Sequence, residues 1–233
     1  MLFWKKMPSL WIGHRITEFN EIETSHAIAA LKIYLTLCLF SDDRGGGVRT
    51  TELTFTELSE KASLSRSLVN DGIKVLYSKG LIKNISGSKR KKIYTVDMEG
   101  ELRDGWCKLP VAGIVSADFK IIPFQSMHNR YLFERVALQL YIYLLYARDN
   151  QQNFTLARKS TLRAKIASDL PTVNKAITYL IHIGLLESIK QKNSIELPVN
   201  MFHDSFYFHF KMKGSCDLTY KKTLKMNEED VPF

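Results

Sequence analysis

Apolar residues recur every three or four positions between Ile28 and Leu39, which predicts a largely buried first helix. A glycine-containing stretch then breaks this period, and two shorter helices are expected before Gly80, which can end the second of them. Apolar positions on both sides of a Ser-Gly-Ser turn at residues 86–88 predict a hairpin. Serine or threonine stands where each helix is expected to begin: Thr24 or Ser25, Thr54 or Thr56, and Ser65.

The same order recurs in the second half of the chain. The stretch FERVALQLYIYLLYARD corresponds to the first helix, with Ala137-Leu138 on Ala30-Leu31 at an offset of 107. The second and third helices are expected in KSTLRAKIAS and DLPTVNKAITYLIHIG, and the second hairpin in LLESIKQKNSIELPV. The pattern therefore predicts one structural unit used twice.

The third helices carry the repeat most clearly, because their matching residues keep a constant offset of 104. The lead-ins before the two first helices also match, since each contains a Lys-apolar-Pro triplet, at residues 6–8 and 108–110. We expect two domains, at residues 1–100 and 101–210, and a partly disordered tail at residues 211–233. The residues that match in the third helices are Val69, Asn70, Ile73, Leu76, Gly80 and Leu81 with Val173, Asn174, Ile177, Leu180, Gly184 and Leu185.

Composition narrows the class of partner. The chain of 233 residues has 33 Lys and Arg against 24 Asp and Glu, a formal charge of +9 that favours a polyanion. The three cysteines are far apart in sequence, so neither a zinc cluster nor a disulfide framework is indicated, and no cofactor is expected. No apolar stretch reaches the roughly 18 residues of a membrane span, and the N-terminus lacks the features of a secretory signal. We therefore expect a cytoplasmic protein without a membrane partner.

Helix, short turn, helix and basic hairpin is the order of the winged-helix form of the helix-turn-helix. The stretch from Ser65 to Ile82 follows Ser-x-x-x-Val-x-x-x-Ile-x-x-Leu-x-x-x-Gly-Leu-Ile and resembles the recognition helix of bacterial winged-helix DNA-binding proteins. The resemblance covers about residues 25–97 and 131–199. It implies a mainly α fold with small β-hairpin wings (α+β), arranged as two tandem winged-helix domains. Two such units in a chain of this length resemble plasmid and phage replication initiators and bacterial transcriptional regulators.

A winged-helix protein would contact bases in the major groove with the outward face of the third helix, and the phosphate backbone with its hairpin. In the first copy this face is polar or basic except for Asp71. This acid could accept from a cytosine amino group, could pair with Lys74 or Lys79, or could show that the face does not lie flat on DNA. In the first unit, the expected contacts with double-stranded DNA are Arg66, Ser67, Asn70 and Lys74 in the third helix, and Lys89, Arg90, Lys91 and Lys92 in the hairpin. In the second unit they are Thr172, Asn174, Lys175 and Thr178 in the third helix, and Lys190 and Lys192 in the hairpin.

Other functions find less support. The triplet Gly45-Gly46-Gly47 lacks the Gly-Lys-Ser/Thr of a phosphate-binding loop, and no catalytic constellation can be named, so the chain is not expected to be an enzyme. The alternative function is a winged-helix protein–protein interaction subunit of a chromosome-organising complex, although such subunits are commonly acidic. The strand-like aromatic stretch MFHDSFYFHFKM either packs on the second domain or forms a homodimer contact. A replication origin and a promoter operator both remain candidate targets, because they need the same groove contacts.

Overall fold

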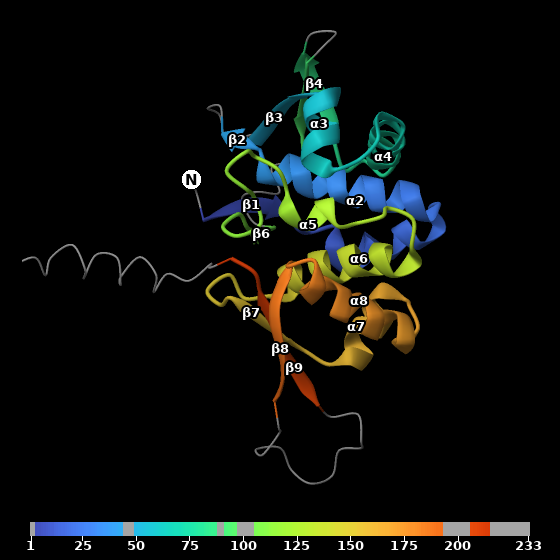
Figure 1. Cartoon of the computed structure of the whole chain (residues 1–233), viewed down its shortest axis with the longest axis vertical. Helices are drawn as coiled ribbons and strands as arrows, with labels where there is room; N and C mark the ends of the chain where they lie inside the picture. Colours follow the sequence, from blue (N-terminus) through green and yellow to red (C-terminus); the bar gives the residue numbers. More distant parts are fainter. Residues whose placement is uncertain (1–2, 44–48, 88–90, 97–104, 193–205, 215–233) are drawn as a thin grey trace, which may run out of the picture.

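The computed structural model describes residues 3–43, 49–87, 91–96, 105–192 and 206–214. They form helices and small antiparallel sheets, so the expected α+β class is confirmed. The molecule is elongated, and a hairpin extends from each of its two ends (Figure 1). Between these ends, the helices α2 (Thr24–Leu39) and α6 (Leu132–Ala147) pack against each other.

The first unit contains a long helix, a strand, two shorter helices and a hairpin. Thirteen of the 16 residues of α2 are buried, because this helix is covered by its own unit on one side and by α6 on the other. Its N-cap is Glu23, whose carboxylate accepts from the N–H of His26, and not Thr24 or Ser25 as expected. The sheet order is β2-β3-β5-β4. The remaining elements are β2 (Asp42–Asp43), β3 (Arg49–Thr54), α3 (Phe55–Ala62), α4 (Arg66–Ser78), β4 (Lys83–Gly87) and β5 (Lys91–Thr95).

The second unit repeats this order, with a sheet of order β7-β9-β8. Its hairpin differs from the expected one, because the strand that pairs with β8 lies at residues 207–212, beyond the stretch LLESIKQKNSIELPV in which the whole hairpin was expected. The second half of the aromatic stretch, Tyr207–Met212, is thus a strand of this unit, and its Phe210 is fully buried. The elements that follow α6 are β7 (Phe154–Ala157), α7 (Lys159–Ile166), α8 (Leu170–His182), β8 (Leu186–Lys192) and β9 (Tyr207–Met212).

The expected offsets between the two units are confirmed by local structure. Adding the third-helix offset of 104 to the bounds of α3 and α4 gives the bounds of α7 and α8. Ser63 and Ala167 both take the left-handed conformation directly after the second helix, with φ of 49° and 50°. Two equivalent hydrogen bonds of 2.7 Å join β3 to α2 and β7 to α6. Thr51 Oγ1 donates to the carbonyl of Leu37, and Thr155 Oγ1 donates to that of Leu144.

The two lead-ins pair with each other. Strand β1 (Trp4–Pro8) is antiparallel to β6 (Trp106–Pro110), and Lys6 lies directly opposite Lys108. Because these strands are equivalent in the repeat, their pairing places a local two-fold axis between the two lysines. The indoles of Trp4 and Trp106 stack at 5.7 Å, with Lys6 Nζ 4.5 Å from the Trp106 ring and Lys108 Nζ 5.0 Å from the Trp4 ring. The short helices α1 (Ile12–Arg15), η1 (Ile16–Glu21) and α5 (Ile122–Gln125) complete the lead-ins.

Candidate nucleic-acid interface

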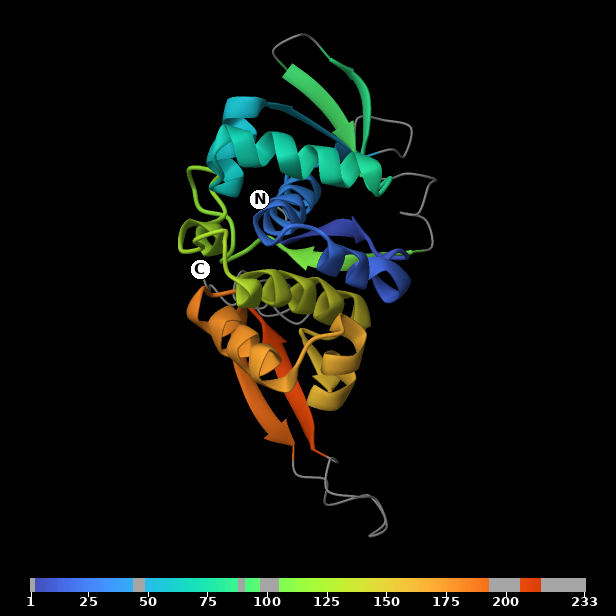
Figure 2. The ribbon, with the colours of Figure 1, turned by 90° about the vertical axis from the view of Figure 1, so that its right-hand side faces the viewer.

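Both third helices lie on the face of the molecule that Figure 2 presents to the viewer. Helix α4 begins at the expected cap, because Ser65 Oγ accepts from the N–H of Leu68. Its inner face buries Val69, Ile73 and Leu76 as the pattern predicted. Gly72 allows a close approach to α2, since a Cβ at this position would lie 2.9 Å from the backbone of Ala29. Packing of this face therefore fixes which side chains of α4 point outward.

The expected DNA-binding side chains of α4 are exposed, but several have partners within the protein. Arg66 Nη2 donates to Thr56 Oγ1 at 2.6 Å. Asp71, which the sequence left with several roles, lies 3.6 Å from Lys74 Nζ and 3.6 Å from His26 Nε2. Asn70 is exposed. Helix α4 therefore presents polar, basic and acidic groups on its outward face.

The outward face of α8 is free of carboxylates after its N-cap. Thr172 Oγ1 is bound to the cap residue, Asp169, at 2.7 Å, and Thr178 Oγ1 donates to the carbonyl of Asn174 at 3.2 Å. The Oδ1 atom of Asn174 is buried and has no hydrogen-bond partner among the described residues. Lys175 is exposed, and its Nζ lies 4.2 Å from the ring of Phe133. The positive charge of this helix is thus held against an aromatic ring.

The hairpin residues are only partly described. In the first hairpin, Lys92 is half-buried, and Lys91 lies 3.8 Å from Glu52 of β3, a carboxylate that the hairpin sequence itself does not contain. Lys89 and Arg90 lie outside the described residues. In the second hairpin, Lys190 is exposed, and Lys192 is the last described residue of β8.

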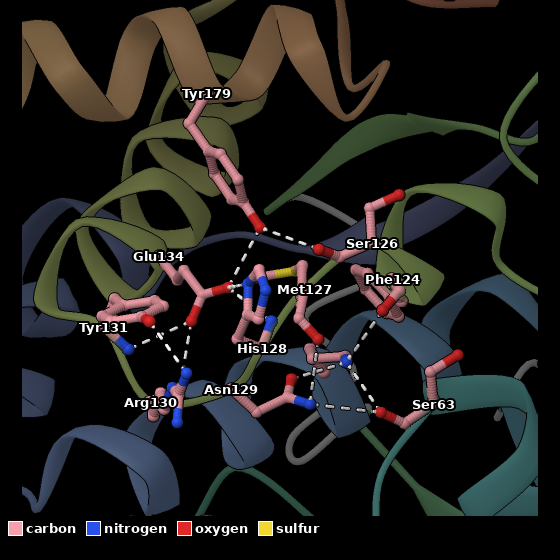
Figure 3. A network of polar contacts seen from close by, with 11 residues as sticks. Ser63, Phe124, Ser126, Met127, His128, Asn129, Arg130, Tyr131, Glu134 and Tyr179 are labelled. Carbon is pink, nitrogen blue, oxygen red and sulfur yellow. Dashed lines mark hydrogen bonds and ion pairs between the residues drawn. The ribbon is translucent and has the colours of Figure 1, made fainter.

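Sequence reasoning missed a polar network between the two units (Figure 3). The carboxylate of Glu134, in the first turn of α6, is fully buried. It accepts from the backbone N–H groups of His128 at 2.6 Å and of Arg130 and Tyr131 at 3.0 Å, and from the hydroxyl of Tyr179 at 3.0 Å. Burial alone would raise the pKa of Glu134, but these donors outweigh it and lower that pKa, so the carboxylate is ionised. The same network raises the pKa of Tyr179, through burial first and the charge of Glu134 second.

Lys32 of α2 occupies the other side of this network. Its ammonium donates to Asn129 Oδ1 at 2.8 Å and to the carbonyls of Ser63 and Phe124 at 3.1 and 3.3 Å. Burial lowers the pKa of Lys32 to about 7, against the opposing charge of Glu134. No periodicity in the sequence could have indicated this site, because its groups come from three separate segments.

The same arrangement occurs a second time with different side chains. Gln139, the counterpart of Lys32 in the second long helix, is also fully buried and donates to Asn20 Oδ1 at 2.9 Å. Asn20 Nδ2 then donates to the carbonyl of Ile166, the last residue of α7, at 2.9 Å, and Asn129 Nδ2 donates to that of Ser63, the residue directly after α3, at 3.4 Å. Each long helix therefore binds an asparagine from the lead-in of the other unit, and the two units are joined by crossed contacts.

Two classes of site find no support within the described residues. None of the described helices is long and apolar enough to cross a membrane. Nowhere in the described part of the chain do three or more His, Cys, Asp or Glu side chains gather so that they could hold a metal ion. The polar and basic face with α4 and α8 is therefore the candidate site that the geometry offers.

No protein-family model matches the chain, and no curated protein matches it. Among solved structures, the chain is similar to a Pi initiator protein crystallised in complex with iteron DNA. The identity is 11%, the match covers 91% of this chain and 98% of that one, and the TM-score is 0.45.

Proposed function

We propose that this protein binds double-stranded DNA in a sequence-specific manner through two tandem winged-helix units, as a replication initiator or a transcriptional regulator. The observation that carries the proposal is the position of the two third helices. They lie on one face of the molecule with exposed polar and basic side chains, while their apolar sides are buried against α2 and α6. An element order of helix, strand, two helices and hairpin, found twice, supports the winged-helix assignment.

Charge supports the same proposal. A net charge of +9 would attract a duplex and release counterions from each phosphate that a lysine or arginine neutralises. In the proposed complex, α4 and α8 enter major grooves, and the hairpins contact the backbone on either side. Backbone contacts give affinity, and the helix side chains give sequence preference. We propose no catalytic role.

Selection from a pool of random-sequence duplexes tests this function. The purified full chain is mixed with the pool, retained duplexes are amplified, and the enriched sequences are read after several rounds. We expect an enriched site with two groups of specified base pairs, one for each third helix. Copies of such a site in tandem would favour a replication origin, and a single inverted repeat would favour an operator. A pool that stays random after repeated rounds would contradict sequence-specific binding.

A further inference from the structure

The segment His128–Tyr131, which we call the junction loop, lies between the two units and is hydrogen-bonded from both sides. Glu134 accepts three of its backbone N–H groups, and Lys32 binds the side chain of Asn129. These bonds use the backbone and the asparagine, and none of them uses the guanidinium of Arg130 (Figure 3). The imidazole of His128 lies beside the Glu134 carboxylate, with Nδ1 3.8 Å from Oε1. The side chain of His128 is 61% exposed, and Arg130 and Tyr131 are also exposed.

On one side, the junction loop is continuous with the outward face of α8. The guanidinium of Arg130 lies 4.9 Å from the ring of Tyr131, and its Nη2 donates to the Tyr131 hydroxyl at 2.9 Å. Tyr131 stacks on Phe133 at 5.3 Å, and Phe133 carries Lys175 of α8 on its ring. Arg130 and Lys175 therefore belong to one row of cations and aromatic rings, and neither forms an ion pair with a described carboxylate.

On the other side, the junction loop contacts the turn between α3 and α4. Asn129 Nδ2 donates to the carbonyl of Ser63, which lies two residues before the N-cap of that helix. The loop thus bridges the surface between the two third helices. A duplex that placed major grooves against both helices would carry its phosphate backbone across this bridge.

We propose that the junction loop is a third DNA contact, in which Arg130 binds backbone phosphates between the two third helices, with His128 and Tyr131 beside it. The inference rests on the proposed function and extends it to a surface outside the helices and hairpins. Arg130 is suited to this role because a guanidinium donates two parallel hydrogen bonds to a phosphate. Its contact is independent of base sequence.

The equivalent loop in the first unit has no arginine in place of Arg130. Asn20, the counterpart of Asn129, makes the same two kinds of hydrogen bond. Its neighbours, however, are the buried Phe19 and the exposed acid Glu21 in place of His128 and Arg130. In the first unit, Arg135 of α6 donates to the carbonyls of Phe19 and Asn20, but the loop itself has no basic residue beside its asparagine. The contacts of the asparagine therefore do not need the charge of Arg130.

The test compares Arg130→Gln with Lys120→Gln in the full chain. Lys120 is an exposed lysine on the turn between β6 and α5, which lies across the molecule from α4 in Figure 1, so both variants lose one positive charge. Binding to a random-sequence 30-base-pair duplex is measured by fluorescence anisotropy over a series of salt concentrations. For Arg130→Gln, the slope of log affinity against log salt should become shallower by about 0.9. The loss of affinity of this variant relative to wild type should therefore shrink about threefold between 50 and 200 mM salt. Lys120→Gln should behave as wild type, and Arg130→Lys should restore most of the slope.

The outcomes separate the inference from the proposed function. If the wild type binds with a steep salt slope and Arg130→Gln matches it, the junction loop is not a DNA contact, and the function stands. If the wild type shows no salt-dependent binding to the duplex, both fail. If Arg130→Gln lowers the melting temperature as well as affinity, while Arg130→Lys restores neither, the arginine is structural. A change in sedimentation without a change in DNA binding would make the loop a protein contact and overturn the inference.

Discussion

Helices α4 and α8 have the same length and the same buried positions, yet their outward faces differ in charge. Asp71 of α4 corresponds to Lys175 of α8, at the same offset of 104. The acid lies between His26 and Lys74, whereas the lysine lies on Phe133, next to the junction loop. The repeat has thus kept the residues that pack the helix and changed those that face solvent. This difference indicates which positions serve the fold and which are free to serve binding.

The largest expected effect concerns the start of the two long helices, where Glu134 and Glu23 both accept backbone N–H groups. Glu134→Ala would leave three N–H groups without their acceptor and would remove the shorter of the two hydrogen bonds of the Tyr179 hydroxyl, so we expect a loss of about 3 kcal/mol or more in the free energy of unfolding. Glu23→Ala, at the exposed cap of α2, should cost about 1 kcal/mol. Urea denaturation of both variants measures the difference. Equal losses would mean that the Glu134 network adds nothing beyond an ordinary cap.

The next prediction uses the equivalence of Lys32 and Gln139. The pKa of Lys32 is about 7 in the folded protein and near 10.5 when unfolded, so between these values the unfolded chain binds more protons. The wild type should therefore gain stability as pH rises from 7 to 10, by up to about 1.4 kcal/mol per pH unit, and its stability should not depend on this group below pH 7. Lys32→Gln makes the two junctions alike and should remove this slope. Parallel pH profiles for the two proteins would contradict the assignment.

The matched asparagines of the third helices should differ in DNA binding. A bidentate contact with adenine needs Oδ1 as well as Nδ2, and Oδ1 of Asn174 is buried while Asn70 is exposed. Asn70→Ala should cost about 1–3 kcal/mol on the selected duplex and much less on random DNA. Asn174→Ala should change both affinities little, and it should not lower stability, because the buried oxygen has no partner to lose among the described residues. Titration of the two duplexes with each variant checks this, and a larger loss for Asn174→Ala would reverse the assignment.

The smallest expected effect sharpens the contrast in charge. Lys175→Gln should reduce the salt slope by about 0.9 if the lysine meets a phosphate. Asp71→Asn should raise affinity for random DNA slightly, because it removes a negative charge that would face the phosphates. Anisotropy titrations at several salt concentrations measure both changes. If Asp71→Asn weakens binding instead, the carboxylate takes part in a specific contact.

The residues that could be predicted from sequence are those whose role is local. The caps Thr54 and Ser65, the left-handed Gly80 and the buried stripe of α4 all depend on neighbours within a few positions. The pairing of β8 with β9 could not be anticipated, because β8 ends at Lys192 and its partner begins only at Tyr207. The pairing of the lead-ins joins a segment at the N-terminus to one in the middle of the chain.

In the candidate site, too, the local features could be predicted from the sequence and the long-range contacts could not. The amphipathic pattern identified the outward face of each third helix, since helical geometry alone decides it. The partners of those side chains, such as His26 beside Asp71 and Phe133 beside Lys175, come from other elements. Glu134 and Lys32 gave no signal, because a charged residue in an apolar helix looks the same in sequence whether its partners exist or not.

The antiparallel pairing of the lead-ins has a consequence for how such a molecule can evolve. Two identical chains of one unit, paired strand to strand about the same axis, would carry one surface twice, and any mutation would appear on both halves. Placing both units in a single chain removes that constraint. The asparagines at the crossed junctions stay alike because both halves need them, while Asp71 and Lys175 have diverged. Covalent fusion thus lets a nearly symmetric scaffold carry two different outward faces.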